Sequence, residues 1–262
     1  MKHVKHSLTG NPSRVSRETN IEKIAGDVRE RVARWLRETT LHPREGLLER
    51  IEKMAATLAL WGAHTNLTAD ASDPAEIAFH VIDSLAPIAF AAGANREALE
   101  AVLVEGANAL DLGSGAGFPG LVLAAAFEAR FTLAESRRKR ASYLQVAAHE
   151  MDLKNVAIEQ RRASAGSIAS RFDLVTARAF GTSVELYEIA AAALSLGGFL
   201  LLYASADQML DASAGQVLAE SLDDSRAQTM RFAERAAWTY RVSHGERVAT
   251  RTAVLWRKSR SA

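Results

Sequence analysis

Residues 109–120 have the sequence Ala-Leu-Asp-Leu-Gly-Ser-Gly-Ala-Gly-Phe-Pro-Gly, and an apolar run follows from Leu121 to Phe127. Two apolar residues lead into Asp111, glycines then fall at positions 113, 115, 117 and 120, and the apolar run comes last. This order predicts a strand, a tight turn and a helix. Glycine accepts positive φ and has no Cβ, so a ligand can lie against the backbone N–H groups at the start of that helix. The stretch therefore predicts a binding loop for a nucleotide-like ligand.

A second acidic residue extends the pattern. Residues 131–134, Phe-Thr-Leu-Ala, are predicted to form the next strand, and Glu135 follows directly. A carboxylate at that place accepts hydrogen bonds from both hydroxyl groups of a ribose. Nicotinamide dinucleotides and S-adenosylmethionine (SAM) both carry such a ribose. The zwitterionic methionine end of SAM needs a carboxylate near the turn, so Asp111 favours SAM.

The composition excludes several kinds of site. The chain has 262 residues, which suffices for one α/β core with a smaller appended unit. It has no cysteine, which excludes disulfides, thiolate metal sites and a cysteine nucleophile. The sequence has no apolar run as long as a membrane span, and residues 1–7 lack the apolar core of a signal peptide. We therefore expect a cytoplasmic protein.

The distribution of charge points to an anionic substrate. The net charge is only +1, which argues against a purely electrostatic nucleic-acid binder, but both ends of the chain are basic and the middle is acidic. Within the acidic middle, residues 137–140 read Arg-Arg-Lys-Arg, directly after Glu135. A basic cluster beside a cofactor site attracts a polyanion. For Arg137 and Arg138, a solvated helix start is an equal alternative.

The first third of the chain is predicted to be helical. Residues 1–20 are polar and are expected to form a disordered tail. Apolar residues at helical spacing predict an N-terminal helical region over residues 21–93, with helices at 21–36, 44–61 and 75–92. The third helix carries His80 and Asp83 on one face. Since no third group completes a triad, we do not assign this pair to catalysis.

From residue 94 to residue 262, strands and helices alternate. The predicted strands are 131–135, 156–160, 172–177 and 199–203, and the predicted helices are 139–151, 165–170, 184–194 and 208–223. This alternation predicts a doubly wound, Rossmann-like α/β fold with a mostly parallel sheet. Residues 237–243 and 248–256 predict a closing antiparallel hairpin. This finish is typical of class I SAM-dependent methyltransferases and disfavours a nicotinamide oxidoreductase.

Five motifs occur in a particular order. They are Trp61 with Asn66-Leu67-Thr68, the segment His-Val-Ile-Asp-Ser-Leu at 80–85, the loop at 111–120, Glu135-Ser136 with Lys139-Arg140, and Ala-Arg-Ala-Phe at 177–180. In this order they resemble the motifs of the GidB/RsmG family, the bacterial small-subunit rRNA guanine-N7 methyltransferases. The resemblance covers about residues 45–203 and is weaker in the hairpin.

The resemblance implies a set of site residues for SAM. Gly113 and Phe118 would contact SAM from the loop, Glu135 would hold its ribose, and Ala163 with Ser164 would border the adenine. Arg178 would line the place where cofactor meets substrate, and it is the one residue that we assign to catalysis. The other residues of the loop assigned to the cofactor are Asp111, Ser114, Gly115 and Gly117.

The chemistry of the implied reaction explains the absence of a general base. Guanine N7 carries a lone pair and no proton, so transfer needs alignment only. An arginine on N7 itself would block attack, so Arg178 is expected to position guanine O6, a phosphate or the SAM carboxylate. Lys139 and Arg140 are expected to bind RNA phosphates, which would make activity salt-sensitive. The expected partner is 16S rRNA or a small-subunit precursor, with no membrane and no metal.

Four departures from the family pattern bear on RNA recognition. Phe79 stands in place of an arginine, Ser164 in place of an acid and Tyr203 in place of a lysine, and Arg247-Val248-Ala249 only loosely matches Arg-His-Leu. Two alternatives therefore stay open. One is a methyltransferase that acts on another RNA or a small molecule, and the other is a methyltransferase-like RNA-binding protein without turnover.

Overall fold

A single mixed sheet organises the fold. The computed structural model describes residues 12–62, 65–166, 168, 171–178, 183–204, 230–244 and 247–260. Its seven strands lie in the order β3-β2-β1-β4-β5-β7-β6. The strands are β1 (Asn108–Leu112), β2 (Arg130–Ala134), β3 (Val156–Glu159), β4 (Phe172–Arg178), β5 (Leu194–Ala204), β6 (Met230–His244) and β7 (Arg247–Arg260). Strands β1 to β5 pair in parallel, and β7 is antiparallel to both β5 and β6.

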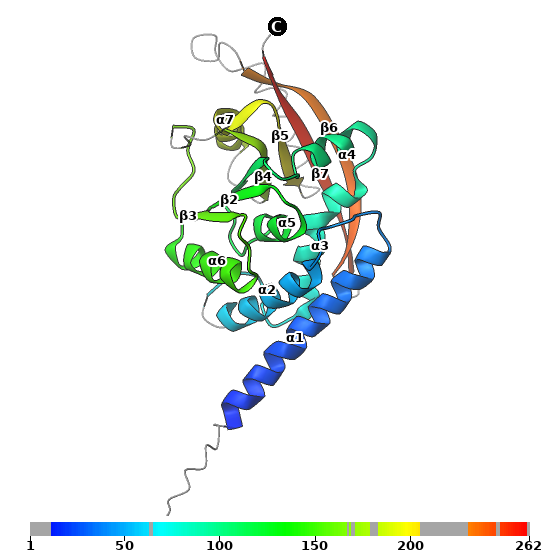
Figure 1. Cartoon of the computed structure of the whole chain (residues 1–262), viewed down its shortest axis with the longest axis vertical. Coiled ribbons are helices and arrows are strands. Elements are labelled where there is room, and N and C mark those ends of the chain that lie inside the picture. The colour runs from blue at the N-terminus through cyan, green and yellow to red at the C-terminus, as the bar shows by residue number, and fades with distance from the viewer. Residues whose placement is uncertain are drawn as a thin grey trace, which may run out of the picture.

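Helices cover both faces of this sheet, as Figure 1 shows. They are α1 (Pro12–Arg37), α2 (Leu47–Gly62), α3 (Pro74–Phe90), α4 (Gly93–Ala101), α5 (Gly120–Ala126), α6 (Arg138–Glu150) and α7 (Ser183–Ala193). The predicted α/β class, the mostly parallel sheet, the closing hairpin and the preceding helices are confirmed.

The order of the strands reverses at β1, which pairs with β2 on one side and β4 on the other. Leu112 is in register with Ala134 of β2 and Ala177 of β4. The three strands therefore end at the same edge of the sheet. In an open α/β sheet, ligands bind at this edge, where the connections diverge.

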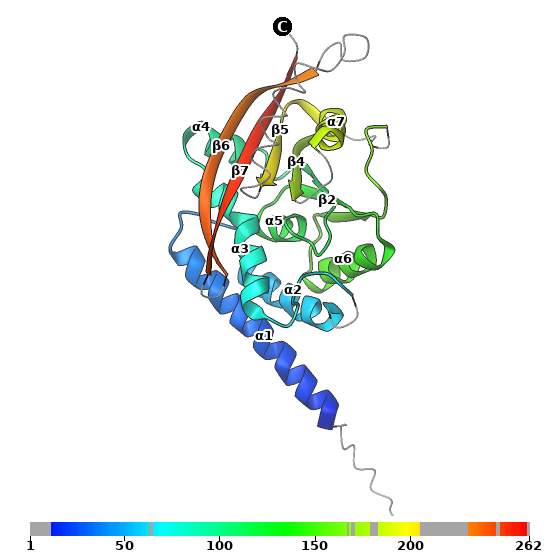
Figure 2. The same cartoon turned by 180° about the vertical axis from the view of Figure 1, so that it is seen from behind.

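Helix α3 lies across the other half of the sheet, beside the hairpin (Figure 2). Arg178, Tyr203 and Ala253 are in register across β4, β5 and β7. Because side chains alternate along a strand, Arg251, two residues before Ala253, lies on the same face. Opposite Arg251 on β6 is Tyr240. This shared face brings side chains from four strands against α3.

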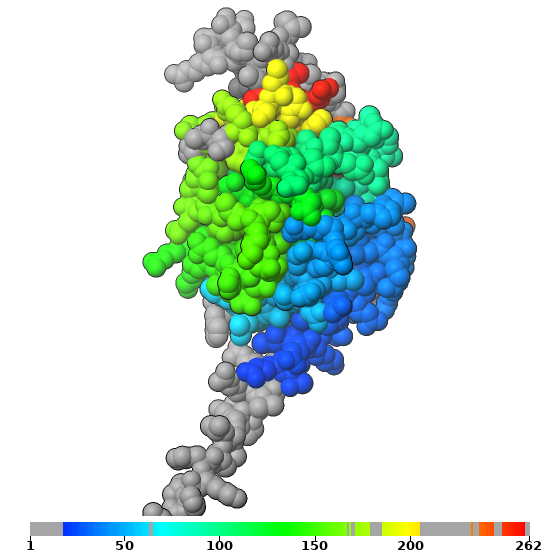
Figure 3. All heavy atoms as spheres, in the orientation of Figure 1, coloured from blue at the N-terminus to red at the C-terminus, as the bar shows by residue number. Residues whose placement is uncertain are grey.

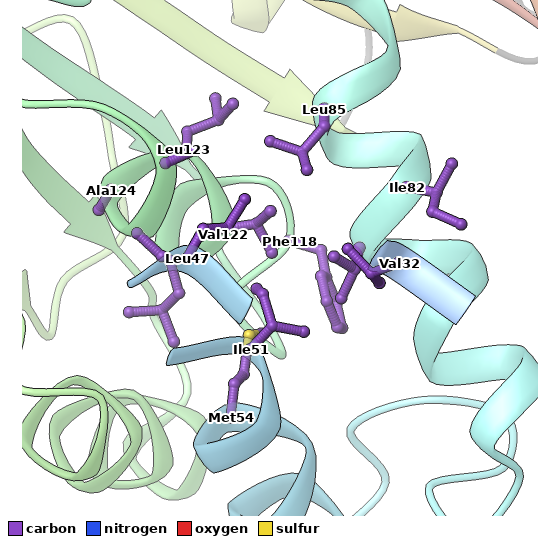
Figure 4. Packing of buried hydrophobic residues seen from close by; sticks show 14 of the residues in the cluster. Val32, Leu47, Ile51, Met54, Ile82, Leu85, Phe118, Val122, Leu123 and Ala124 are labelled. Carbon is purple, nitrogen blue, oxygen red and sulfur yellow. The ribbon is translucent and has the colours of Figure 1, made fainter. Parts of the chain in front are cut away.

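The N-terminal helices share one hydrophobic core with the sheet. Val32 of α1, Ile51 of α2 and Ile82 of α3 are buried in the same cluster as Phe118 and Val122 (Figure 4). Figure 3 shows the blue N-terminal helices in direct contact with the green part of the chain. The helical region predicted at 21–93 and the part from residue 94 therefore pack as one body, while the first turns of α1 extend away from it (Figure 1).

Several elements differ from the sequence-based expectation. Helix α1 begins at Pro12, so residues 12–20 of the predicted tail are helical, and residues 1–11 lie outside the described residues. Proline suits the first turn of a helix because an N–H group there has no intrahelical acceptor. The short helix α4 was not predicted. Residues 165 and 166 form a turn rather than the predicted helix at 165–170.

Part of the predicted structure is not described. Half of the predicted helix at 165–170 and all of the predicted helix at 208–223 lie outside the described residues. Among the described helices, no single one is long and apolar enough to cross a membrane, although α3 and α4 meet that test together as a pair bent by 117°.

Candidate functional site

The glycine loop after β1 is built from three residues in the left-handed region. Gly113, Gly115 and Gly117 have φ values of 70°, 56° and 89°. Only glycine adopts this region without strain from a Cβ. The amides of Gly113 and Ser114 both donate to the Ala134 carbonyl, at 2.9 and 3.2 Å, and the Gly117 amide donates to the Ser114 carbonyl at 2.7 Å. The loop is therefore tied to the end of β2.

Asp111 ties this loop to the sheet through hydrogen bonds of its buried carboxylate. Its carboxylate accepts from the Thr176 hydroxyl at 2.8 Å and from the Gly120 amide at 3.2 Å. Its side chain is fully buried, and burial raises the pKa of the carboxyl group above its ordinary value. A Cβ on Gly120 would lie 2.6 Å from the Asp111 Oδ2, so only glycine allows this approach. Asp111 thus joins β1, β4 and the start of α5.

Glu135 closes the loop from the side of β2. One carboxylate oxygen accepts from the Gly115 amide at 3.0 Å, and the other accepts from the Arg137 amide at 2.7 Å. The residue is buried. A carboxylate oxygen has lone pairs for more than one donor, so both can still accept from ribose hydroxyl groups. Sequence analysis expected Glu135 at this edge, but not its bond to the loop.

Arg178 is the last residue of β4 and reaches across to α3. Its Nη1 donates to Nδ1 of His80 and to Oδ2 of Asp83, both at 3.3 Å. Its guanidinium carbon lies 5.2 Å from the centre of the Phe118 ring. The side chain of Arg178 is 20% exposed, whereas that of Asp83 is 4% exposed. Arg178 is therefore fixed between the glycine loop and α3, with part of its surface open.

Asp83 also binds the C-terminal hairpin. Its Oδ1 accepts from the Tyr240 hydroxyl at 2.9 Å and lies 3.8 Å from the Arg251 Nε. The guanidinium of Arg251 lies over the Phe79 ring, 5.2 Å from its centre. A buried carboxylate costs several kcal/mol unless it is paired, and here two arginines and a hydroxyl group compensate it.

This cluster was not predicted from the sequence. His80 and Asp83 were set aside for want of a third group, and the structure supplies Arg178, Tyr240 and Arg251 from β4, β6 and β7. The signals in the sequence were the shared helix face of His80 and Asp83 and their presence within one of the five motifs. The expected match to the hairpin was Arg247-Val248-Ala249, whereas the hairpin arginine at Asp83 is Arg251.

The remaining predicted site residues lie around the same edge. Ala163 is buried and Ser164 exposed, in the connection after β3. Lys139 is exposed in the first turn of α6. Arg140 donates to the Asn66 carbonyl at 3.1 Å, and its Nη1 lies 3.8 Å from where a Cβ on Gly115 would be. Arg140 is thus at the glycine loop itself.

Two of the departures have structural roles. The Tyr203 hydroxyl donates to the Ser84 carbonyl at 2.8 Å, and burial raises its pKa well above the ordinary value, so it stays a donor at neutral pH. Phe79 is buried beneath Arg251. Among the described residues, no group of three or more His, Cys, Asp or Glu side chains is placed to hold a metal ion.

The sheet order, the glycine loop and the acid after β2 define a class I SAM-dependent methyltransferase. The family described as rRNA small subunit methyltransferase G (GidB) matches residues 47–236, and the chain belongs to this family. SAM is its cofactor.

Several relatives and solved structures are similar to the chain. A ribosomal RNA small subunit methyltransferase G of Wolinella succinogenes is 36% identical over 145 residues, which are 55% of this chain and 68% of the relative. One of Zymomonas mobilis is 36% identical over 164 residues, 62% of this chain and 71% of the relative. The crystal structure of a SAM-dependent O-methyltransferase from Thermotoga maritima has 17% identity and a TM-score of 0.48 over 63% of this chain and 64% of its own.

Proposed function

We propose that this protein transfers the methyl group of SAM to N7 of a guanine in 16S rRNA, as naked RNA or within a small-subunit precursor. The observation that carries the proposal is the placement of Arg178. Its guanidinium is held beside the glycine loop at the carboxyl end of β4, with donors left for a substrate. With ribosomal RNA as the substrate, we expect the reaction to occur in the cytoplasm.

The residues at the sheet edge fit SAM. The loop from Gly113 to Gly117 presents bare backbone, and a Cβ on Gly117 would meet Leu121 at 2.5 Å, so the loop cannot carry a side chain there. Glu135 would accept from the ribose, and Ala163 with Ser164 would border the adenine. Asp111 would hold the glycine loop in place beside the methionine end of SAM. SAM supplies an electrophilic methyl group when bound.

Arg178 would position the guanine rather than exchange a proton with it. N7 attacks with an in-plane lone pair, so the protein must hold the base without covering that atom. The Nη1 of Arg178 is occupied by α3, which leaves its Nε and Nη2 to face O6 or a phosphate. A guanidinium that lies over Phe118 and is paired with a buried carboxylate loses little freedom on binding.

Cations around the edge would hold the RNA backbone. Lys139 is exposed at the start of α6, a position where the helix dipole disfavours a positive charge. A phosphate bound there would relieve this repulsion. Arg140 lies closer to the cofactor loop, and both contacts would weaken as salt concentration rises.

Methylation of small subunits tests this proposal. Subunits from a strain that lacks the protein are incubated with SAM and purified protein, and 7-methylguanosine is mapped in the 16S rRNA. We expect one new modified guanine with the wild type and a loss on the order of 100-fold with Arg178→Ala, because misalignment of reacting groups costs about that much.

Arg130→Ala is the matched control for this test. Arg130 is the exposed first residue of β2, at the end of that strand opposite the binding edge, so the substitution removes the same charge away from the site. We expect an unchanged rate. If strains with and without the protein carry the same 7-methylguanosine, the proposed substrate is wrong. SAM binding without any transfer to RNA would favour a binding protein without turnover.

A further inference from the structure

One nitrogen of Arg178 uses both of its hydrogens on helix α3. Nη1 carries two N–H groups, and its two acceptors, His80 Nδ1 and Asp83 Oδ2, both lie at 3.3 Å. Its Nε and Nη2 donate no hydrogen bond to any of the described residues. Within the described part of the chain, Arg178 is therefore anchored at one edge of its guanidinium, and the other edge has no partner.

The contact with Arg178 fixes the tautomer of His80. A guanidinium has no lone pair and can only donate, so Nδ1 of His80 must be the acceptor and carry no proton. In the neutral imidazole, the proton is then on Nε2. That nitrogen lies 3.0 Å from Oε1 of Glu76, one turn earlier on α3, which is a carboxylate acceptor. Glu76, His80 and Arg178 thus form a chain with one consistent direction of donation.

His80 adds what Asp83 alone cannot provide. Asp83 shares its carboxylate among Arg178, Tyr240 and Arg251, and a single contact would let the guanidinium turn about it. The His80 contact is a second fixed point. The centre of the His80 ring also lies 5.1 Å from that of Phe118, and the guanidinium carbon of Arg178 lies over the same Phe118 ring at 5.2 Å. The hydrogen bonds to His80 and Asp83, together with the contact with the Phe118 ring, fix the orientation of the guanidinium.

We propose that His80, oriented by Glu76, is a positioning residue that fixes the guanidinium of Arg178 for methyl transfer. The inference rests on the proposed function, in which Arg178 touches the substrate. Neither His80 nor Glu76 needs to contact guanine or SAM. What they supply is preorganisation, because a catalytic side chain works only when supporting hydrogen bonds lock its geometry.

Nitrogen-15 NMR of the histidine side chains tests the pairing without any substrate. The signals of His80 are assigned by their absence in His80→Asn. In the wild-type protein, we expect His80 to have an unprotonated Nδ1 and a protonated Nε2. We expect Arg178→Ala or Glu76→Ala to convert this single tautomer to a mixture of tautomers. A protonated Nδ1 in the wild type would overturn the proposal.

A pair of substitutions tests the positioning role in the reaction. The amide of asparagine occupies the place of Nδ1 and can still accept from Arg178, whereas that of glutamine occupies the place of Nε2. We expect His80→Asn to keep the rate within about 5-fold of the wild type and His80→Gln to lower kcat on the order of 100-fold. The KM for SAM should not change in either variant.

Both variants remove the same imidazole ring, so thermal unfolding serves as the control for folding. If both keep the wild-type rate, or both lose activity equally, His80 does not position Arg178. Arg178→Ala is measured in parallel. Full activity in that variant would refute the role of Arg178 in the proposed function, while the tautomer measurement would still decide whether the chain from Glu76 to Arg178 exists.

Discussion

Gly106 and Gly117 have nearly the same backbone angle and very different surroundings. Their φ values are 91° and 89°. A Cβ on Gly106 would meet nothing within 4 Å, whereas one on Gly117 would lie 2.5 Å from the Leu121 Cδ1. The two glycines therefore separate backbone strain from steric contact.

We expect Gly106→Ala to lower the free energy of unfolding by about 1–2 kcal/mol, the cost of a left-handed non-glycine residue. Gly117→Ala should cost about 1–3 kcal/mol more because Leu121 must move. Only Gly117→Ala should weaken SAM binding. Urea unfolding and calorimetry with SAM measure both effects, and equal losses in the two variants would mean that the loop has room for a side chain.

Whether a site residue could be predicted from the sequence depends on how far away its partners lie along the chain. Glu135 was predicted because it follows a strand at the binding edge, which is a local property, and Arg178 was assigned through the family resemblance of the motif at 177–180. Asp83 was not, because its partners Arg178 and Tyr240 are 95 and 157 residues away. Spacing along one helix showed that His80 and Asp83 share a face, but only the register of β4, β6 and β7 determines what meets that face.

At the scale of elements, α5 depends on side chains from outside itself. It has only seven residues, all of them buried. Asn155 Nδ2 donates to the carbonyl groups of Ala124, Phe127 and Ala129 at 3.1, 3.2 and 2.9 Å. Arg44 donates to two carbonyl groups in the same turn, at 2.7 and 3.0 Å. These donors satisfy carbonyl groups that have no partner at the end of a helix.

We expect Asn155→Ala to lower the free energy of unfolding by about 1–3 kcal/mol, the cost of leaving a buried acceptor unpaired. Asn155→Asp should cost more, although it keeps the shape, because it points carboxylate oxygens at carbonyl oxygens. Urea unfolding of both variants shows which one loses more stability. Asn20→Ala, on the exposed surface of α1, is the control. A smaller loss for aspartate than for alanine would mean that Asn155 acts by filling space.

Strand β5 shows why element boundaries are harder to predict than elements. The sequence predicts that this strand begins at Phe199, after two glycines, but the strand begins at Leu194. Gly198 lies where a Cβ would be 3.1 Å from two carbonyl oxygens of β4, at an irregularity in the β4–β5 pairing. The glycine there marks a close approach of two strands rather than a loop, and only the neighbouring strand distinguishes the two.

At the scale of the whole molecule, α1 adds a layer outside the part that matches the family. The match begins at residue 47, but Ile24, Val28 and Val32 of α1 are buried in the main hydrophobic core. Helix α1 packs against α2 and α3, both of these pack against α5, and α3 also binds Arg178. Stability of the site is therefore expected to depend on a segment that lies far from it in sequence.

Two truncations test this dependence. Removing residues 1–37 takes away the buried side chains of Ile24, Val28 and Val32 and exposes the apolar residues that they cover. At about 1.5–3 kcal/mol for each side chain, the free energy of unfolding should fall by roughly 5 kcal/mol or more. Removing residues 1–20, which ends before Ile24, should change the free energy of unfolding by less than about 1 kcal/mol. Urea unfolding and SAM calorimetry on both truncations provide the comparison. If the chain that begins at residue 38 unfolds at the same urea concentration as the full chain and binds SAM equally well, α1 is an appendage, and the core that supports the site ends at α2 and α3.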